Sequence, residues 1–267
     1  MSGVLRFAGL LNRVLHIGAG SGSDLAAYLE AGARSVVLVE ADPERAAALE
    51  RLAADRPEVR VVEAAVSGAP GTRPFHITSF PELNSFRAPA GLKDLFPGLR
   101  ILSSAKMVAT RPAELVRQME FPTGEAGALL VVEAPGEGLG ILQDLAEAGL
   151  LERFGHIVVR EAARGLYDGA PAAEDLAGWL GSAGYAVAME AAPEDPERPY
   201  LMARFDHSAA LTGQLDAARD EIRKLQDELK AARDMSRYRM AQSREELLKA
   251  EGQILLLRDL LIDGSGV

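Results

Sequence analysis

The sequence predicts an α/β fold, in which helices cover both faces of a mostly parallel sheet, followed by one long C-terminal helix. Two observations predict this arrangement. Short apolar segments alternate with helical patterns as far as residue 206, which is typical of strands joined by right-handed helical crossovers. A heptad pattern then runs from Leu211 to Leu261, as in coiled coils. We therefore expect a globular domain over residues 1–206 and a coiled-coil segment over residues 207–263.

The chain is organised around residues 14–25, whose sequence is VLHIGAGSGSDL. The apolar start predicts a strand, and the end predicts the beginning of a helix. The three glycines between them, Gly18, Gly20 and Gly22, predict a turn, because glycine adopts positive φ angles and lets the backbone approach a ligand closely. The free N–H groups of the following helix point at whatever lies over this turn. Such turns occur in sites for dinucleotides, in sites for S-adenosylmethionine and in purely structural settings.

The second strand, Ser35–Glu40, is apolar and ends on an acid, and Asp42 and Pro43 then signal the start of a helix. Glu40 follows the glycines by about 20 residues. This spacing places its carboxylate at the end of the neighbouring strand, where it can accept hydrogen bonds from both hydroxyls of an adenosine ribose. The alternative is a solvated glutamate at a strand end, but the glycine turn at the correct distance favours the ribose contact.

The rest of the globular domain continues the alternation of strands and helices. We expect strands over residues 58–66, 73–78, 106–110, 128–133, 155–160, 185–190 and 200–205, and helices over residues 24–33, 112–119, 141–151 and 173–182. Between residues 79 and 104 the periodicity is lost and Pro and Gly are frequent, which predicts a long loop with short helical pieces. A long loop in a compact domain is usually functional or mobile.

The composition excludes several classes of site. The chain of 267 residues has no cysteine, so it forms neither disulfides nor thiolate metal sites. Its four histidines lie far apart in the sequence, and we expect no metal because none of them has a partner at a ligand spacing. No segment approaches the roughly 20 apolar residues of a membrane span. Residues 1–13 are typical of a helix packed on the domain rather than of a signal peptide, so we expect a cytoplasmic protein.

The formal net charge is −10. Residues 207–267 contain ten Lys or Arg and eleven Asp or Glu, so residues 1–206 carry a net charge of −9. Binding to nucleic acid and to anionic membranes relies on basic surface. We therefore expect no nucleic-acid partner.

Six motifs follow one another in the globular domain: VLHIGAGSGSDL, VVLVEADPERAAALERL, VRVVEAAVSG, ITSFPELNSF, ALLVVEAPGEG and LLERFGHIVVREA. Their order and spacing resemble those of class I S-adenosylmethionine-dependent methyltransferases, most closely the FkbM-type family, over roughly residues 12–205. The resemblance implies a Rossmann-like sheet of seven strands with the last strand antiparallel. It also implies that S-adenosylmethionine binds over the carboxyl ends of the first strands.

The resemblance further implies which residues contact this cofactor. The implied contacts are Gly18, Ala19, Gly20 and Gly22 for the methionine part, Glu40 for the ribose, Ala41, Glu63 and Ala64 for the adenine, and Asn84 and Ser85 for a lid over cofactor and acceptor. His16 stands where these families usually have an acid that organises the amino-acid part of the cofactor. A neutral imidazole can hydrogen-bond to the cofactor there, but it cannot replace the charge. A histidine hydrogen-bonded within the core is the alternative.

The candidate catalytic groups lie mostly in the fourth-strand motif. The FkbM pattern there resembles lysine, apolar, Asp, apolar, Glu, Gly, any residue, Glu, whereas this sequence has VVEAPGEG at residues 131–138. Glu133 keeps the acid with one more methylene, and Glu137 could supply a carboxylate from a neighbouring position. His76 and Glu82 are further candidate bases.

The resemblance implies O-methyl transfer to a saccharide or a similar small metabolite, in which the protein positions the reactants and removes a proton from the acceptor hydroxyl. The fourth-strand motif has lost its lysine and both glutamates, so the alternative is a methyltransferase-fold scaffold or adaptor with weakened or lost catalysis. This scaffold would assemble through its coiled coil. A nicotinamide dehydrogenase is disfavoured, because no Tyr–Lys or Cys–His catalytic pair is evident in the sequence.

In the tail, apolar or small residues recur at spacings that alternate between four and three residues, which is a heptad seam. The seam comprises Leu211, Leu215, Ala218, Ile222, Leu225, Leu229, Ala232 and Ser236, and then Met240, Ser243, Leu247, Ala250, Ile254, Leu257 and Leu261. The step from Ser236 to Met240 is a four where a three is due, which is a stutter that locally unwinds a supercoil.

A helix of about 50 residues that exposes such a seam needs a partner. We expect residues 211–261 to form a homo-oligomer or to bind a partner helix. The alternative is a helical hairpin folded back on its own domain. The arginine-rich segment 234–244 is only weakly apolar and predicts a hinge or a break between two helices.

Overall fold

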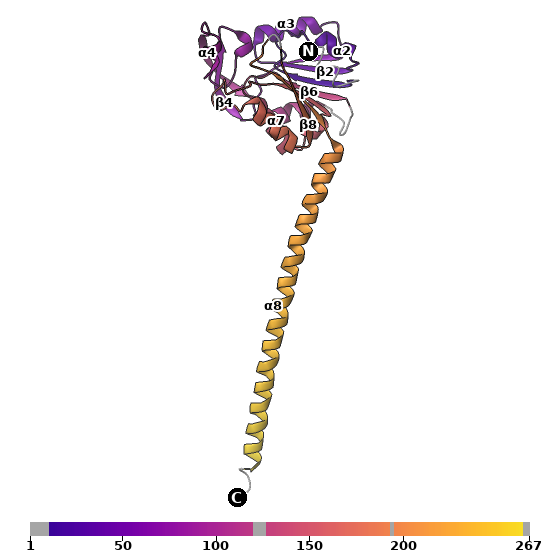
Figure 1. Ribbon diagram of the computed structural model, residues 1–267, viewed down its shortest axis with the longest axis vertical. Helices are drawn as coiled ribbons and strands as arrows, with labels where there is room; N and C mark the ends of the chain where they lie inside the picture. The colour runs from indigo at the N-terminus through magenta and orange to yellow at the C-terminus, as the bar shows by residue number, and fades with distance from the viewer. Residues whose placement is uncertain (1–10, 120–126, 193–194, 264–267) are drawn as a thin grey trace. The chain divides into compact units, whose positions relative to one another are not determined.

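The computed structural model describes residues 11–119, 127–192 and 195–263 (Figure 1). The chain divides into two compact units, Met1–His207 and Ser208–Val267. The helix expected near the N-terminus falls on residues 1–10, which lie outside the described residues, and Arg13 already begins the first strand.

The first unit is built on a seven-stranded sheet in the order β3-β2-β1-β6-β7-β9-β8. The strands are β1 Arg13–Ile17, β2 Ser35–Glu40, β3 Val59–Glu63, β6 Ala128–Val132, β7 His156–Arg160, β8 Tyr185–Glu190 and β9 Tyr200–Phe205. Strands β3, β2, β1, β6 and β7 pair in parallel, whereas β9 runs antiparallel to both β7 and β8. The predicted Rossmann-like α/β sheet with an antiparallel last strand is therefore confirmed.

Helices cover both faces of this sheet because its central strands are apolar on both sides. On one face, residues of α5 (Pro112–Gln118), α6 (Gly138–Glu147) and α7 (Ala173–Ser182) pack into one hydrophobic cluster with the strands. On the other face, residues of α2 (Leu25–Glu30) and α3 (Pro43–Ala53) pack into a second cluster. Asp42 caps α3 by accepting hydrogen bonds from the backbone N–H groups of Glu44 and Arg45, as its position before Pro43 predicts.

Two strands stand outside the main sheet. β4 (Gly71–Thr78) and β5 (Ile101–Ala109) form a separate antiparallel pair. The strand expected to begin at residue 106 thus begins at Ile101. The loop expected over residues 79–104 therefore ends at residue 100. It contains the short helices η1 (Pro81–Leu83) and α4 (Leu92–Leu95). The first four residues of β5, ILSS, are exposed and lack an alternating pattern, so only their pairing with β4 reveals the strand.

Helix boundaries differ from the predictions where glycine intervenes. α6 begins at Gly138, three residues before the expected start, and ends before Gly149, whose φ is +66°. A separate 3₁₀ turn, η2 (Leu151–Arg153), follows it. α2 ends at Glu30, just before Gly32 with a φ of +91°. A left-handed glycine is a common helix terminator.

The second unit consists of α8 (His207–Asp263), a single helix of 57 residues. The prediction of a hinge or break over residues 234–244 is wrong, because α8 is helical throughout this segment. Residues 207–263 also contain no hairpin turn, since α8 is a single unbroken helix. Within the described residues, no helix combines the length and apolar character that crossing a membrane would require.

Candidate functional site

The glycine turn after β1 is shaped by close packing. Gly18 has a φ of +83°, and a Cβ there would lie 2.5 Å from the backbone oxygen of Glu133. A Cβ on Gly22, whose φ is +73°, would meet the Leu49 side chain at 2.6 Å. Both positions therefore need glycine for two reasons, the positive φ angle and the absence of space.

Gly20 differs from these two because it borders open space. Its φ is +56°, and the nearest heavy atom to a Cβ at this position would be Nη1 of Arg45, 3.8 Å away. Its backbone N–H donates a hydrogen bond of 2.7 Å to Oε2 of Glu40. The missing side chain of Gly20 thus leaves room for a ligand beside Glu40.

Glu40 lies at the carboxyl end of β2 with only 8% of its surface exposed. Besides the bond from Gly20, its Oε1 accepts hydrogen bonds of 2.9 Å from the backbone N–H groups of Ala41 and Asp42. A carboxylate has about four acceptor positions, so one remains on Oε2, which serves one ribose hydroxyl and not the expected two. The three backbone donors fix the orientation of this carboxylate.

A cavity opens beside this turn at the carboxyl ends of the parallel strands, with a volume of about 880 Å³ that includes its open mouth. Its walls combine apolar side chains with charged ones. The apolar side chains include Ala41, Ala64, Ala65, Val66, Phe75 and Phe86, and the charged ones include Glu40, Asp42, Arg45, Glu82, Glu133, Glu137, Arg160 and Arg198. Parallel α/β sheets bind their ligands at this edge.

The fold brings most of the predicted site residues to this cavity. The predicted residues that line it are Gly18, Gly20, Glu40, Ala41, Ala64, Asn84, Ser85, Glu133 and Glu137, together with the candidate base Glu82. The predicted residues that do not line it are His16, Ala19, Gly22, Glu63 and His76. Glu63 is exposed at the end of β3, beside Glu40 in the sheet register.

His16 lies in the core beneath the turn. It is 2% exposed, and its Nδ1 lies 3.0 Å from the hydroxyl oxygen of Tyr28 on α2. Burial lowers the pKa of His16 to about 4, against an opposing effect of the nearby Asp24 carboxylate. The imidazole is therefore neutral near pH 7 and hydrogen-bonded inside the protein.

His76 lies on β4, and its Nδ1 is 3.0 Å from the Ser104 hydroxyl oxygen on β5. Its backbone pairs with that of Ser85. The backbone of His76 thus helps to hold residue 85 in place, while its side chain contacts the neighbouring strand.

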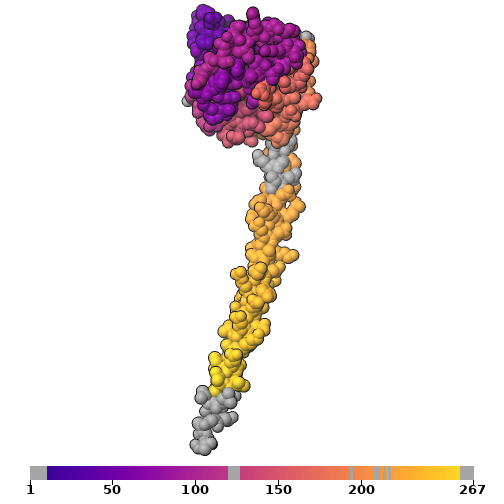
Figure 2. Space-filling model, turned by 90° about the vertical axis from the view of Figure 1, so that its left-hand side faces the viewer, coloured from indigo at the N-terminus to yellow at the C-terminus, as the bar shows by residue number. Residues whose placement is uncertain are grey.

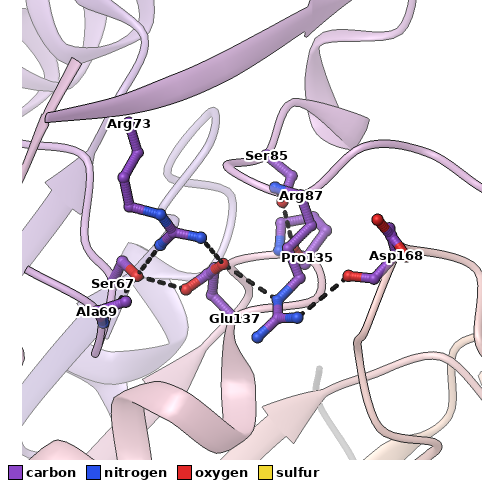
Figure 3. Close-up of polar contacts among 8 residues, drawn as sticks. All are labelled: Ser67, Ala69, Arg73, Ser85, Arg87, Pro135, Glu137 and Asp168. Atoms are coloured by element: carbon purple, nitrogen blue, oxygen red, sulfur yellow. Dashed lines mark hydrogen bonds and ion pairs between the residues drawn. The ribbon is translucent and has the colours of Figure 1, made fainter. Parts of the chain in front are cut away.

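Glu137 is surrounded by positive groups (Figure 3). It is 3% exposed at the start of α6, and its Oε2 accepts a hydrogen bond of 2.5 Å from Ser67. Its Oε1 forms ion pairs with Nε of Arg87 at 3.2 Å and with Nη2 of Arg73 at 3.7 Å. The Arg87 contact is an ion pair only, because its geometry does not meet that of a hydrogen bond. Arg73 also donates to the Ser67 hydroxyl at 2.6 Å. Two guanidinium groups thus neutralise this buried carboxylate, which favours a structural role over proton transfer.

The predicted lid segment is fastened to the same region. Ser85 donates a hydrogen bond of 2.6 Å from its hydroxyl to the backbone oxygen of Pro135, and Arg87 donates to the backbone oxygen of Asp168 at 3.1 Å (Figure 3). Asn84 accepts a hydrogen bond of 2.7 Å from the backbone N–H of Thr78. Asn84 and Ser85 therefore form a fixed wall of the cavity.

One buried acid near the site escaped prediction. Glu161 follows β7 and is 1% exposed, and burial raises its pKa to about 7 although backbone N–H groups donate to it. A Cβ on Gly138 would lie 2.8 Å from its Oε2, so the missing side chain at residue 138 leaves room for this carboxylate. Glu161 directly follows an apolar strand in the motif HIVVREA, as Glu133 does in its own motif, and this pattern could have indicated it.

A second missed group is a cluster of charges on the cavity wall. Asp195 accepts from Nε of Arg198 at 2.7 Å and lies 3.5 Å from Nη2 of Arg160. The Arg160 guanidinium also lies over the Tyr200 ring, 5.1 Å from its centroid. Asp195 joins the end of β7 to the segment before β9, and the sequence carries no local signal for this contact. Among the described residues, no cluster of three or more His, Asp or Glu side chains could hold a metal ion.

No protein-family model and no curated protein matches this chain. Several solved structures are similar in fold. TrmK of M. capricolum, in complex with S-adenosyl-homocysteine, is 10% identical, with 77% of this chain and 69% of that chain covered and a TM-score of 0.44. The methyltransferase FkbM of Methylobacillus flagellatus is 14% identical, with 73% and 44% covered and a TM-score of 0.45. A ribosomal protein L11 methylase of Lactobacillus delbrueckii is 12% identical, with 76% of each chain covered and a TM-score of 0.41.

This chain thus spans less than half the length of the FkbM structure. With identities of 10 to 14% and TM-scores below 0.5, these similarities specify neither a substrate nor a reaction for this chain.

Proposed function

We propose that this chain binds S-adenosylmethionine in the cavity and transfers the methyl group to a hydroxyl oxygen. The observation that carries the proposal is the pairing of Gly20 with Glu40 on one cavity wall, with open space above Gly20 and one acceptor position left on Glu40. A ribose hydroxyl can donate to that position. The apolar side chains of Ala41, Ala64 and Phe75, which line the same cavity, suit an adenine ring.

Glu133 is the proposed base for the acceptor hydroxyl. It follows β6, lines the cavity and is partly exposed. Of the other predicted bases, Glu137 is held by two arginines and His76 lies outside the cavity lining. Glu82 lines the cavity but is paired with Arg45 at 3.6 Å. The bound cofactor supplies an electrophilic methyl group on a sulfonium. Glu133 would orient the acceptor hydroxyl and take its proton as the methyl group passes from sulfur to oxygen, with the electrons of the broken sulfur–carbon bond left on a neutral thioether.

The proposed acceptor is a saccharide or a similar small metabolite, as the FkbM-type resemblance implies. The charge distribution supports a small acceptor over a nucleic acid, because residues 1–206 carry a net charge of −9 and nucleic-acid binding relies on basic surface.

The test is transfer of a labelled methyl group from S-adenosylmethionine to a panel of saccharides, with RNA and protein acceptors in parallel. We expect labelled saccharide, and Glu133→Gln should slow transfer by about 10²-fold or more while cofactor affinity stays unchanged. Glu50→Gln, an exposed acid on α3, is the matched control and should transfer at the full rate. Cofactor binding without transfer to any acceptor would instead support the scaffold alternative.

A further inference from the structure

The seam of α8 is exposed along its described length. Figure 2 draws α8 in space-filling form. The nine large apolar side chains of the seam between residues 211 and 257 are 52 to 72% exposed: Leu211, Leu215, Ile222, Leu225, Leu229, Met240, Leu247, Ile254 and Leu257. Because α8 is one unbroken helix, all these side chains belong to a single continuous stripe. A stripe of this kind is stable in water only when another helix covers it.

The spacing of the seam is mirror-symmetric about Ser236. Read outward from Ser236 in either direction, the steps are four, three, four, three, four, three and four residues. The stutter, which breaks an ordinary heptad, lies at the centre of this symmetry. Every seam position therefore has a counterpart at the same distance on the other side of Ser236.

The residue sizes are complementary across this centre. Each small residue faces a large counterpart: Ala218 with Ile254, Ala250 with Ile222, Ser243 with Leu229, and Ala232 with Met240. The remaining counterparts are leucines: Leu211 with Leu261, Leu215 with Leu257, and Leu225 with Leu247. Only Ser236 is its own counterpart.

We propose that α8 pairs with α8 of a second copy of this chain as an antiparallel two-stranded coil, whose two-fold axis passes beside Ser236. In this register each seam residue meets its counterpart, so every layer except the central serine pair contains at least one large side chain. Large side chains opposite small ones fill the interior without voids. The heptad positions also agree, because antiparallel coils pair an a position with a d position and each counterpart pair here is of that kind.

A parallel pair would pack much worse. In it each residue meets its own copy, so Ala218, Ala232, Ser243 and Ala250 would each form a layer of two small side chains. Such layers leave cavities, and cavities cost free energy in proportion to their volume. The size pattern therefore favours the antiparallel direction.

The seam is large enough for a stable dimer. Burying one Leu or Ile side chain contributes about 1.5–3 kcal/mol, which corresponds to about 60–120 Å² of buried apolar surface at 25 cal/mol per Å². The nine described large side chains on each of two helices then bury roughly 1,100–2,200 Å². Stable protein interfaces bury about 1,200–2,000 Å², so a second copy of α8 alone is a sufficient partner.

Cysteine cross-linking of the full chain tests the direction directly, because the natural sequence has no cysteine. Ser236→Cys should form a disulfide with its own copy under mild oxidation. Ala218→Cys alone and Ile254→Cys alone should not cross-link, because 36 residues of helix separate the two copies of each by about 54 Å, far beyond disulfide reach. A mixture of these two variants, exchanged by unfolding and refolding, should cross-link between unlike chains.

The mass of the unmodified chain completes the test. Light scattering should give twice the chain mass of 28.4 kDa. Self-cross-linking of Ala218→Cys would show a parallel pair and overturn the proposal. A monomeric, trimeric or tetrameric mass would overturn it as well.

Discussion

Glu161 is the buried acid whose ionisation should govern how the stability of the globular unit depends on pH. Its pKa is about 7 in the folded protein, because burial disfavours the charged form. In the unfolded chain a glutamate has a pKa near 4.5. Between these values the folded state binds more protons than the unfolded state, so the stabilisation present at low pH is lost as the pH rises toward 7.

We therefore predict that Glu161→Gln raises the free energy of unfolding at pH 8 relative to the natural protein. The difference in free energy between variant and natural protein should be on the order of 3 kcal/mol more favourable to the variant at pH 8 than at pH 4.5. Urea unfolding followed by the fluorescence of Trp179, the only tryptophan, reports on the globular unit. Glu50→Gln should show no such difference between the two pH values. An effect of Glu161→Gln that is the same at both pH values would contradict the assignment.

His16 affects the pH dependence of stability in the opposite direction. Burial holds its pKa near 4, so the unfolded state binds more protons between about pH 4 and the ordinary histidine value of 6.5. Its contribution to stability is present above that range and is lost as the pH falls through it. In Glu161→Gln, stability should therefore rise with pH over this interval, whereas in the natural protein the two groups offset each other.

Site residues could be predicted where the signal lies within one βαβ unit. The glycine turn and Glu40 are of this kind, because their spacing along the chain fixes their meeting in space. The environment of Glu137 could not be predicted, because Ser67, Arg73 and Arg87 come from other segments that only the complete fold brings together. The Asp195 contacts escaped prediction for the same reason.

At the scale of elements, the central strands of the main sheet could be predicted because their apolar runs report burial on both faces. β2, β8 and β9 have the predicted bounds. The β4–β5 pair was harder, since the first four residues of β5 are exposed and only later residues, such as Met107 and Ala109, pack into a hydrophobic cluster with Phe75 of β4. The continuity of α8 through residues 234–244 also differs from the prediction. Its exposed methionine, tyrosine and arginines remain compatible with a helix, since helix propensity there is adequate.

The proposed pairing of α8 predicts one substitution that weakens the dimer and a second that restores it. Ala218→Leu should weaken the dimer, because the new side chain meets Ile254 in two symmetry-related layers and overpacking costs about 1–3 kcal/mol in each. Adding Ile254→Ala should restore the dimer, since the layer again contains one large and one small residue. The dissociation constant from sedimentation equilibrium measures both effects. A tighter dimer with Ala218→Leu alone would indicate the parallel arrangement and contradict the antiparallel register.

For the whole molecule, we expect the two units to be separable. A chain truncated after Asp206 retains the residues of both main hydrophobic clusters and lacks the whole of α8. It should therefore remain folded and become monomeric, as measured by circular dichroism and light scattering. An oligomeric mass for the truncated chain would place self-association in the globular unit instead.

The central claim is that the cavity beside Gly20 and Glu40 holds S-adenosylmethionine. Isothermal titration calorimetry of the full chain tests it most directly, with Glu40→Gln as the site variant and Glu50→Gln as its control. We expect one binding site per chain in the natural protein and in Glu50→Gln. Glu40→Gln should bind at least about tenfold more weakly, a loss of about 1.4 kcal/mol, because an amide cannot accept the ribose hydroxyl and the backbone N–H groups as a carboxylate does. No binding to the natural protein, or equal affinity in Glu40→Gln, would contradict the claim.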